Sequence, residues 1–489
     1  MATKKDLVEA YSFSRRRLVT AFVSGAPGGR EVEPARPGRA VIGGMALAVL
    51  LLAGAAVLNI IGSPVELDES KPQLISAKES GADYVLVAAP GSEELQLRPV
   101  INITSAMLLL GADVEPLVVP RDKLTGLTPG QPIGILQAPA TPPPVEALIA
   151  SGWTACAGVG PGSGEAGGLK VTVSATPGVV PTPGISFVVR TASGRLYLVA
   201  ETLRGAPVGG EARAHAYELP DQGDAATQVL AAVAGGSPSQ AIDVPDQWVT
   251  TFPAGGDLAL STFGLARGDV GRPFRGGPDS GPLSDLEVGD VIEAAGRSYL
   301  LSTRSEVILL DDFARLVYLG SVPDGRTPID AGDTLPSGIE VPESSVLDGA
   351  RWPEGPTTGQ STGEPCSLLR TSPGAAPYAV MAQAIPGSAA SAADVVPGAP
   401  VAVVDAGAGA LVRSGGWFDE EAPTRLLVDD RGYAYGVASA EEAGRLGYEA
   451  VPSQVVPDSW RELFVSGVLL SIEAARCPPT SQPREGSCG

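Results

Sequence analysis

A short pattern occurs four times along this sequence, so the fold must be assembled from small units. Each copy contains Gly-x-x-Tyr followed by a short apolar run, and an apolar stretch precedes each glycine. The pattern predicts two strands joined by a tight glycine turn, with the tyrosine on the second strand. The four tyrosines are Tyr84, Tyr197, Tyr299 and Tyr435.

A second pattern follows each predicted hairpin: a proline, a bulky apolar residue seven positions later and a glycine ten positions later. Glycine and proline are common here, with 62 and 45 of 489 residues, so neither pattern is specific by itself. Four ordered pairings of the two patterns nevertheless predict a true repeat. The prolines are Pro120, Pro245, Pro328 and Pro457, and the glycines are Gly130, Gly255, Gly338 and Gly467.

Between the two patterns the sequence predicts a short helix, over residues 102–111, 224–236, 311–320 and 439–447. Ser439 and Glu442 form a capping-box pattern. Three glycines stand where a left-handed helix cap is favoured; they are Gly111, Gly320 and Gly447. A unit of this size cannot bury its own apolar face, so it must pack on its neighbours or on a shared core.

The spacing of the repeats is nearly palindromic, because two long inserts separate the outer repeats from the inner ones. This spacing predicts an elongated α+β molecule of pseudo-twofold character, in which the inserts form a central β-rich domain. Repeats 1 and 4 then lie together, as do repeats 2 and 3. The expected boundaries are repeat 1 at 63–135, the central domain at 136–184 and 341–422, repeat 2 at 185–262, repeat 3 at 263–340, repeat 4 at 423–470 and a C-terminal tail at 471–489.

An uncharged apolar run at residues 40–62 precedes the repeats. As a helix it reaches about 35 Å, enough to cross a hydrocarbon core of about 30 Å, and it predicts a transmembrane helix. A cleaved signal peptide is the competing interpretation, but its apolar region is usually shorter. The leader, residues 1–39, is basic, whereas Glu66, Asp68 and Glu69 follow the run. The positive-inside rule therefore predicts a single-pass protein of the cell membrane with a cytoplasmic N-terminus and an extracytoplasmic bulk.

The whole chain carries a formal net charge of −21. A field of that sign repels phosphate backbones, which excludes nucleic acid as the main partner. The leader nevertheless contains the run Arg15, Arg16 and Arg17. These arginines enforce the topology, bind anionic lipid or contact another protein, and the sequence does not separate the three roles.

Four cysteines lie in the part expected to be extracytoplasmic, where disulfides are the default. If the two cysteines that are nearest in the sequence form one disulfide, Cys477 pairs with Cys488. Cys156 then pairs with Cys366 across a long loop. The alternatives are the other two connectivities and four free thiols.

The residue patterns do not favour an enzyme. None of the six lysines follows a glycine, so there is no P-loop, and the single histidine, His215, is expected on the surface. The Gly-x-Ser-x-Gly at 359–363 lies in a loop rich in proline, glycine and threonine, not at a strand-to-helix elbow. The pairs 311–312 and 429–430 are explained by a helix start and a hairpin turn. We expect no catalytic residues, no metal and no other cofactor.

Several motifs resemble the EccB family, a membrane core component of actinobacterial type VII (ESX) secretion systems. They are Tyr11-x-Phe13 followed by Arg15–Arg17, the single anchor, and residues 98–102 (Arg-Pro-Val-Ile-Asn) with Ser105-Ala106. The resemblance covers nearly the whole chain and is most specific in residues 1–135. It implies a cytoplasmic tail, one transmembrane helix and four periplasmic repeats around a central domain with a disulfide, matched here by Cys156 and Cys366.

What the resemblance implies is assembly rather than chemistry. A protein of this family is a structural subunit that supplies periplasmic mass and contacts between sister copies. Its partners would be an EccC-like ATPase, EccD-like and EccE-like membrane subunits and a mycosin-like protease. The leader would contact other subunits at the cytoplasmic face.

A cell-wall-binding module is the main alternative, since small repeated β units on an anchor can hold a polymer through avidity. The chain offers few aromatic residues for stacking on sugars, and Trp248 and Trp460 are expected to fill the core instead. A nucleotide hydrolase is the third alternative, disfavoured by the missing P-loop.

Overall fold

The structure is a computed structural model of the whole chain. It describes residues 3–24, 37–61, 67–88, 92–159, 166–220, 224–275, 283–302, 307–322, 326–336, 339, 341–342, 345–357, 359, 361 and 363–480. Two compact units are present, Met1–Leu67 and Asp68–Gly489.

The first unit consists of two helices, α1 (Lys4–Ser24) and α2 (Pro37–Ile61). Helix α2 covers most of the uncharged run at 40–62. Within the part of the chain that the structure describes, no helix has both the length and the apolar character needed to cross a membrane. The transmembrane helix therefore stays a prediction.

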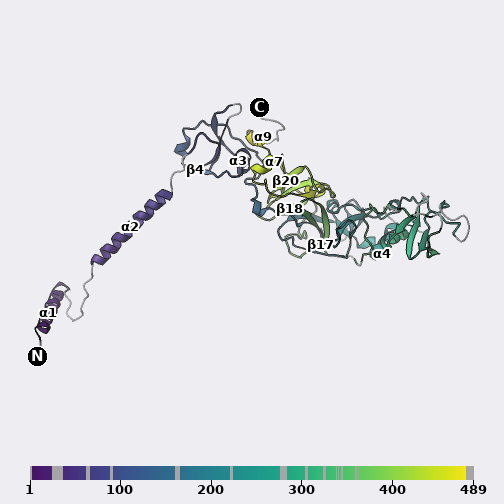
Figure 1. Cartoon of the computed structure of the whole chain (residues 1–489), viewed down its shortest axis with the longest axis horizontal. Helices are drawn as coiled ribbons and strands as arrows, with labels where there is room; N and C mark the ends of the chain where they lie inside the picture. Colours follow the sequence, from purple (N-terminus) through teal and green to yellow (C-terminus); the bar gives the residue numbers. More distant parts are fainter. Residues whose placement is uncertain are drawn as a thin grey trace. The chain divides into compact units, whose positions relative to one another are not determined.

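The described part of the second unit contains five sheets, so the protein has the expected mixed α+β character (Figure 1). The first repeat shows the shared plan: three consecutive antiparallel strands, a helix, and a fourth strand that pairs in parallel with the first. The helix is needed because parallel strands require a long crossover. Its elements are β1 (Gln73–Ala77), β2 (Asp83–Ala88), β3 (Leu95–Pro99), α3 (Ile103–Leu110), β4 (Leu117–Val119) and the 3-10 helix η1 (Arg121–Leu124).

The second and third repeats follow the same plan, with strand orders β10-β9-β8-β11 and β14-β13-β12-β15. The second comprises β8 (Phe187–Thr191), β9 (Leu196–Thr202), β10 (Arg213–Glu218), α4 (Asp224–Ala234), η3 (Pro238–Gln240), β11 (Ile242–Val244), α5 (Asp246–Val249) and η4 (Leu260–Phe263). The third comprises β12 (Val291–Ala294), β13 (Arg297–Leu301), β14 (Val307–Leu310), α6 (Asp312–Ser321) and β15 (Ile329–Gly332).

The fourth repeat has the strand order β22-β19-β20-β21-β23. Its first strand begins at Ala410, before residue 423 where we expected this repeat to start. Its elements are β19 (Ala410–Gly415), β20 (Thr424–Val428), β21 (Tyr433–Val437), α7 (Ala440–Arg445), β22 (Gln454–Pro457), α8 (Asp458–Arg461) and β23 (Val465–Ser466), and α9 (Ile472–Arg476) follows.

The tyrosine pattern is not equivalent in all four repeats. Tyr84, Tyr197 and Tyr299 lie on the second strand of their sheets, but Tyr435 lies on the third, β21. The predicted equivalence of Tyr435 is therefore wrong by one strand. The glycine of the pattern makes a tight turn in each case, because Gly81, Gly194, Gly296 and Gly432 all have φ between 65° and 85°.

The proline pattern also has one exception. Pro120, Pro245 and Pro457 each precede a short helix that follows the fourth strand. Pro328 instead comes immediately before the fourth strand, β15, so its predicted equivalence is wrong. Its partner in the pattern, Gly338, lies outside the described residues.

The two long inserts combine into one central six-stranded sheet of order β18-β6-β5-β16-β17-β7. Three of its strands come from each insert, as expected for a shared central domain. They are β5 (Trp153–Val159), β6 (Ala166–Val173), β7 (Val179–Pro181), β16 (Pro365–Ser372), β17 (Ala375–Ala384) and β18 (Val401–Val404), and η2 (Val145–Ala147) precedes them.

The repeats associate in the predicted pairs. Repeats 2 and 3 share one apolar core that contains both α4 and α6. In repeats 1 and 4, α3, α7 and α9 lie next to one another although they come from opposite ends of the unit (Figure 1). Gly111 and Gly447 have the positive φ that we predicted.

Gly320 is not the helix cap that we predicted, because it lies within α6. A Cβ atom there would be 2.8 Å from the Cα atom of Val229 in α4. Its role is to let two helices approach closely, which the local sequence does not reveal.

Candidate functional site

The centre of the molecule is a disulfide between the two inserts. Cys156 of β5 and Cys366 of β16 are directly opposite each other in an antiparallel pair, with Cα atoms 4.1 Å apart. The expected pairing is therefore present. The bond closes a loop of 210 residues, which stabilises the fold by about 5 kcal/mol in the chain-entropy account.

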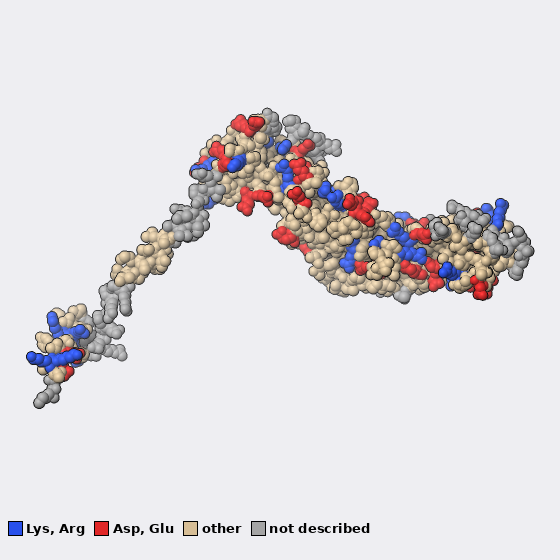
Figure 2. All heavy atoms as spheres, in the orientation of Figure 1, with Lys and Arg blue, Asp and Glu red and all other residues tan. Residues whose placement is uncertain are grey.

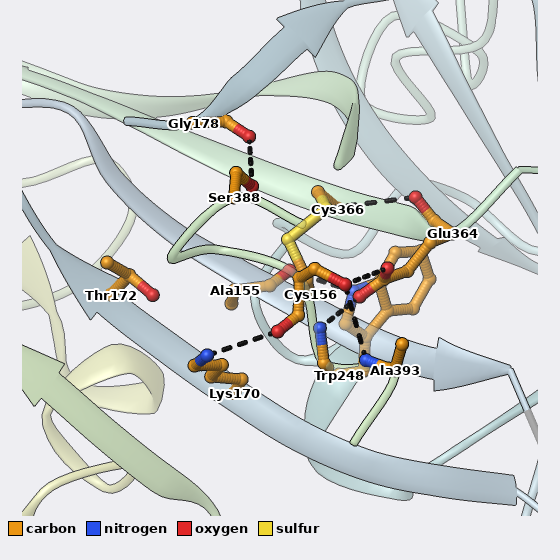
Figure 3. Close-up of a disulfide and its surroundings, with 12 residues drawn as sticks. Ala155, Cys156, Lys170, Thr172, Gly178, Trp248, Glu364, Cys366, Ser388 and Ala393 are labelled. Atoms are coloured by element: carbon orange, nitrogen blue, oxygen red, sulfur yellow. Dashed lines mark hydrogen bonds between the residues drawn. A yellow bond between two sulfur atoms is a disulfide. The ribbon is translucent and has the colours of Figure 1, made fainter. Parts of the chain in front are cut away.

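A loop covers this disulfide and excludes solvent from it (Figure 3). Both cysteines and the loop residues Ala390 and Ala392 are fully buried. Polar contacts hold the loop in place: Ser391 donates to Glu364 at 2.8 Å, and Ser388 donates to the carbonyl of Gly178 at 2.8 Å. A buried disulfide of this kind is a structural crosslink rather than a reactive one.

Two tryptophans connect neighbouring parts of the fold: Trp248 joins repeat 2 to the central sheet, and Trp460 joins repeat 4 to repeat 2. Trp248 of α5 donates from Nε1 to the carbonyl of Ala155 at 3.1 Å, and Trp460 of α8 donates to the carbonyl of Thr251 at 3.1 Å. Both side chains are fully buried, so the expectation that they fill the core is confirmed. Through these rings, repeats 2 and 4 and the central sheet share one apolar core.

A polar contact also joins repeat 2 to the central sheet, and the sequence analysis did not predict it. Glu201 of β9 accepts a hydrogen bond from the amide of Met381 in β17 at 3.2 Å. Burial, together with the smaller effect of nearby Glu211, raises the pKa of this carboxyl to about 7. Glu211 itself accepts from Tyr378 at 3.1 Å and lies 3.5 Å from Arg370.

His215 does not lie on the surface, as we had expected. It is 1% exposed, because successive residues of β10 are buried on both faces of the strand. Burial, together with the smaller effects of Arg351 and Arg213, lowers the pKa of its imidazole to about 4. Nδ1 lies 3.3 Å from the carbonyl of Arg213, and Nε2 has no partner among the described residues.

The pattern residues remain distributed over four sheets and do not converge on a site. Tyr197 donates to Glu218 at 3.1 Å, and Tyr435 donates to Asp429 at 3.1 Å. Tyr299 is buried and Tyr84 is half-buried. These side chains anchor their own repeats.

The acidic pairs and the Gly-x-Ser-x-Gly segment have the expected structural roles. Asp311 caps α6 by accepting from the amide of Ala314 at 2.8 Å. Asp429 accepts from the amides of Arg431 and Tyr433 in a turn. Ser361 lies in irregular backbone before β16. The described residues contain no group of three or more potential metal ligands.

The leader helix α1 carries a candidate contact surface of its own. Tyr11, Leu18 and Phe22 are exposed and line a hollow of about 430 Å³ together with Arg15. Arg16 and Arg17 lie on the same helix. This helix offers an apolar strip with a basic margin.

The second expected disulfide involves Cys477, which is disulfide-bonded. Its expected partner, Cys488, lies outside the described residues. The visible face of the second unit carries acidic and basic side chains intermixed, without a basic stripe (Figure 2).

Comparison with known proteins gives one consistent result. The family described as "Type VII secretion system ESX-1, transport TM domain B" matches residues 1–480. The ESX-1 secretion system ATPase EccB1 of Mycolicibacterium smegmatis is 27% identical, over 92% of this chain and 91% of its own length. Its namesake from Mycobacterium tuberculosis H37Rv is 26% identical, over 99% and 96%.

Two solved structures have a similar fold. One is an intact ESX-5 inner membrane complex, with a TM-score of 0.58 and 20% identity over 100% of this chain and 98% of the matched chain. The other is an EccB3 dimer from the ESX-3 core complex, with a TM-score of 0.59 and 18% identity over 82% and 99%.

Proposed function

The chain belongs to the EccB family of ESX type VII secretion systems, and we propose that it is a structural subunit of such a secretion complex in the inner membrane. This proposal rests on the way the repeats and the central sheet of the second unit are linked to one another. Cys156–Cys366 locks the central sheet, Trp248 fixes repeat 2 to it, and Trp460 joins repeat 4 to repeat 2. Such a body can hold several partners at fixed positions.

We propose that the protein is a single-pass membrane protein with its second unit outside the cytoplasm. The basic leader, the apolar run at 40–62 and the acidic residues that follow it support this topology. The disulfide-bonded cysteines Cys156, Cys366 and Cys477 support an oxidising compartment for the second unit.

The proposed partners are an EccC-like ATPase, EccD-like and EccE-like membrane subunits, a mycosin-like protease and sister copies of this chain. Membership of the family supports this set, as does the similarity to chains of an inner membrane complex and of an EccB dimer. We assign the cytoplasmic contacts to α1, whose exposed Tyr11, Leu18 and Phe22 offer an apolar strip.

Several relatives carry the word ATPase in their names, but we propose a non-enzymatic role for this chain. No lysine in the whole sequence follows a glycine, so the phosphate-binding loop Gly-Lys-[Ser/Thr] is missing. His215, the single histidine, is buried within repeat 2. Purified chain should therefore hydrolyse ATP no faster than a buffer control.

The deciding experiment is extraction from the native membrane in mild detergent, capture through a C-terminal tag, native-gel sizing and mass spectrometry. We expect a large particle that contains an FtsK/SpoIIIE-type ATPase and a polytopic membrane protein. Recovery of the 49.5 kDa chain alone, or bound to wall fragments, would contradict the proposal.

A further inference from the structure

The central disulfide lies at the last position where β5 and β16 pair. Their register runs from Leu369 opposite Trp153 to Cys366 opposite Cys156, and β16 begins only one residue earlier, at Pro365. The Cα atoms of the two cysteines are 4.1 Å apart, close to the separation of a pair that shares no main-chain hydrogen bonds. The disulfide therefore fixes the relative position of the two strands at this end of their ladder.

The loop over the disulfide, here called the lid, comprises residues 385–398. On the side of Cys366 the lid is held by Glu364, which lies two positions before that cysteine. The carboxylate of Glu364 accepts from the hydroxyl of Ser391 at 2.8 Å and from the amide of Ala392. Because Glu364 lies just beyond the end of the ladder, its position depends on the crosslink.

On the side of Cys156 the lid is held by Lys170 of β6. Lys170 stands opposite Cys156 in the register of β5 and β6, and it donates from Nζ to the carbonyl of Ser391 at 3.1 Å. Figure 3 shows Lys170 and Glu364 on either side of the disulfide. Ser391 therefore contacts both sides of the crosslink, Glu364 through its hydroxyl and Lys170 through its carbonyl.

The lid also packs closely on the main chain of β5 and β6. A Cβ atom at Gly158, two positions after Cys156, would lie 2.6 Å from the carbonyl oxygen of Ala392. One at Gly168 would lie 2.5 Å from the carbonyl oxygen of Val396. Contacts this close tolerate little displacement. A shift of β5 against β16 would therefore disturb the packing of the lid.

We propose that the lid is a redox-dependent element, which closes stably only over the oxidised cysteine pair and in turn shields that pair from thiols. Without the bond between the sulfur atoms, the spacing of Glu364 and Lys170 would vary, and Ser391 would not keep both contacts. The coupling is reciprocal, because a disulfide that favours lid closure by a given factor is itself favoured by closure to the same extent. A chain that escapes oxidation would expose the lid to proteases.

Reduction of the pair requires access for an external thiol. A thiolate attacks one sulfur atom, forms a mixed disulfide and releases the other cysteine as a thiolate. A second thiolate then attacks the mixed disulfide, so the reductant leaves as its own disulfide and the two cysteines gain two electrons and the two protons that the thiols lose. Both cysteines and the lid residues Ala390 and Ala392 are fully buried. The first attack therefore requires the lid to open.

The first test is the rate at which dithiothreitol reduces the folded full-length protein, followed by alkylation of Cys366 and mass spectrometry. Glu364→Ala removes two hydrogen bonds to a charged acceptor, so the lid should open more often and reduction should be at least about tenfold faster. The matched control is Glu146→Ala, since Glu146 is exposed on η2, and it should keep the wild-type rate. In urea all three proteins should be reduced equally fast. Equal rates in the folded proteins would overturn the inference.

The second test changes the disulfide and leaves the lid intact. The amide of Gly168 donates to the lid carbonyl of Val395 at 3.0 Å. With Cys156→Ser and Cys366→Ser combined, we expect this amide to exchange its hydrogen at least about tenfold faster, relative to helix α6 of repeat 3. Unchanged relative exchange would overturn the inference. If the serine variant does not fold, the reduction rates decide alone, because they are measured on oxidised protein.

Discussion

The inner pair of repeats and the outer pair are joined in different ways. Repeats 2 and 3 are neighbours in the sequence and share a single continuous apolar core, with α4 against α6. Repeats 1 and 4 come from opposite ends of the second unit and share a smaller core. Polar contacts to the main chain supplement that core: Arg445 donates to the carbonyl of Leu109 at 2.9 Å, and Gly134 donates to the carbonyl of Cys477 at 3.0 Å.

The difference shows how the fold holds together two repeats that are far apart in the sequence. Neighbouring repeats meet at a low entropic cost, so their shared apolar core needs little support beyond the ion pair between Arg204 and Asp311. Distant repeats need additional constraints, and here the central disulfide brings the two inserts together. Arg445 also satisfies the C-terminal carbonyls of α3, where a cation is favoured.

Removal of the central disulfide should have the largest effect on this comparison. We expect Cys156→Ser with Cys366→Ser to lower the free energy of unfolding by about 5 kcal/mol, because a loop of 210 residues is no longer closed. In hydrogen exchange, repeats 1 and 4 should lose protection before repeats 2 and 3. Equal loss in both pairs would refute the idea that only the outer pair depends on the crosslink.

The helix contact of the inner pair is the next most sensitive point. Gly320→Ala places a methyl group 2.8 Å from the Cα atom of Val229, which should cost about 2–3 kcal/mol of folding free energy. Gly444→Ala in α7 is the matched control, since its nearest neighbour is 3.8 Å away. That variant should be neutral or up to about 1 kcal/mol more stable. Urea unfolding of both proteins provides the comparison.

The pH dependence of stability should separate two groups of repeat 2. The His215 pKa of about 4 lies below the ordinary value of 6.5 for histidine. The unfolded chain therefore binds the proton first, and stability falls as pH drops from about 6.5 to 4. The Glu201 pKa of about 7 lies above 4.5, so stability falls as pH rises from 4.5 to 7. Wild-type stability should therefore change little across this range.

Each variant should expose the contribution of the other group. With Glu201→Gln, the free energy of unfolding should rise with pH between 4 and 6.5, by about 2 kcal/mol. With His215→Gln it should fall between pH 4.5 and 7. Urea titrations at several pH values measure both slopes, and parallel profiles of the two variants would contradict this assignment.

Trp460→Phe should have the smallest effect. Phenylalanine keeps an aromatic ring at this position, but the hydrogen bond from Nε1 of the tryptophan to the carbonyl of Thr251 is lost. That carbonyl still accepts from Ser367 at 3.1 Å, so it is not left unsatisfied. We expect a loss of about 1 kcal/mol in thermal unfolding. A loss above about 3 kcal/mol would indicate that the ring packing itself had changed.

Much of the organisation could be predicted from the sequence, because local features encode it. The glycine turns at Gly81 and Gly194, the helix cap at Asp311 and the pairing of Cys156 with Cys366 all follow from residue chemistry and order. The displacement of Tyr435 by one strand was not predictable, because a hairpin pattern does not number the strands around it.

The sequence by itself determined the repeats, their pairing and the family of the protein, since these depend on residue identity and spacing. Only the tertiary structure decided that His215 is buried, that Gly320 admits a neighbouring helix and that Glu201 faces β17. The physical reason is that burial and edge pairing depend on residues more than 90 positions away, such as Ala350 over Gly256, which no local pattern contains.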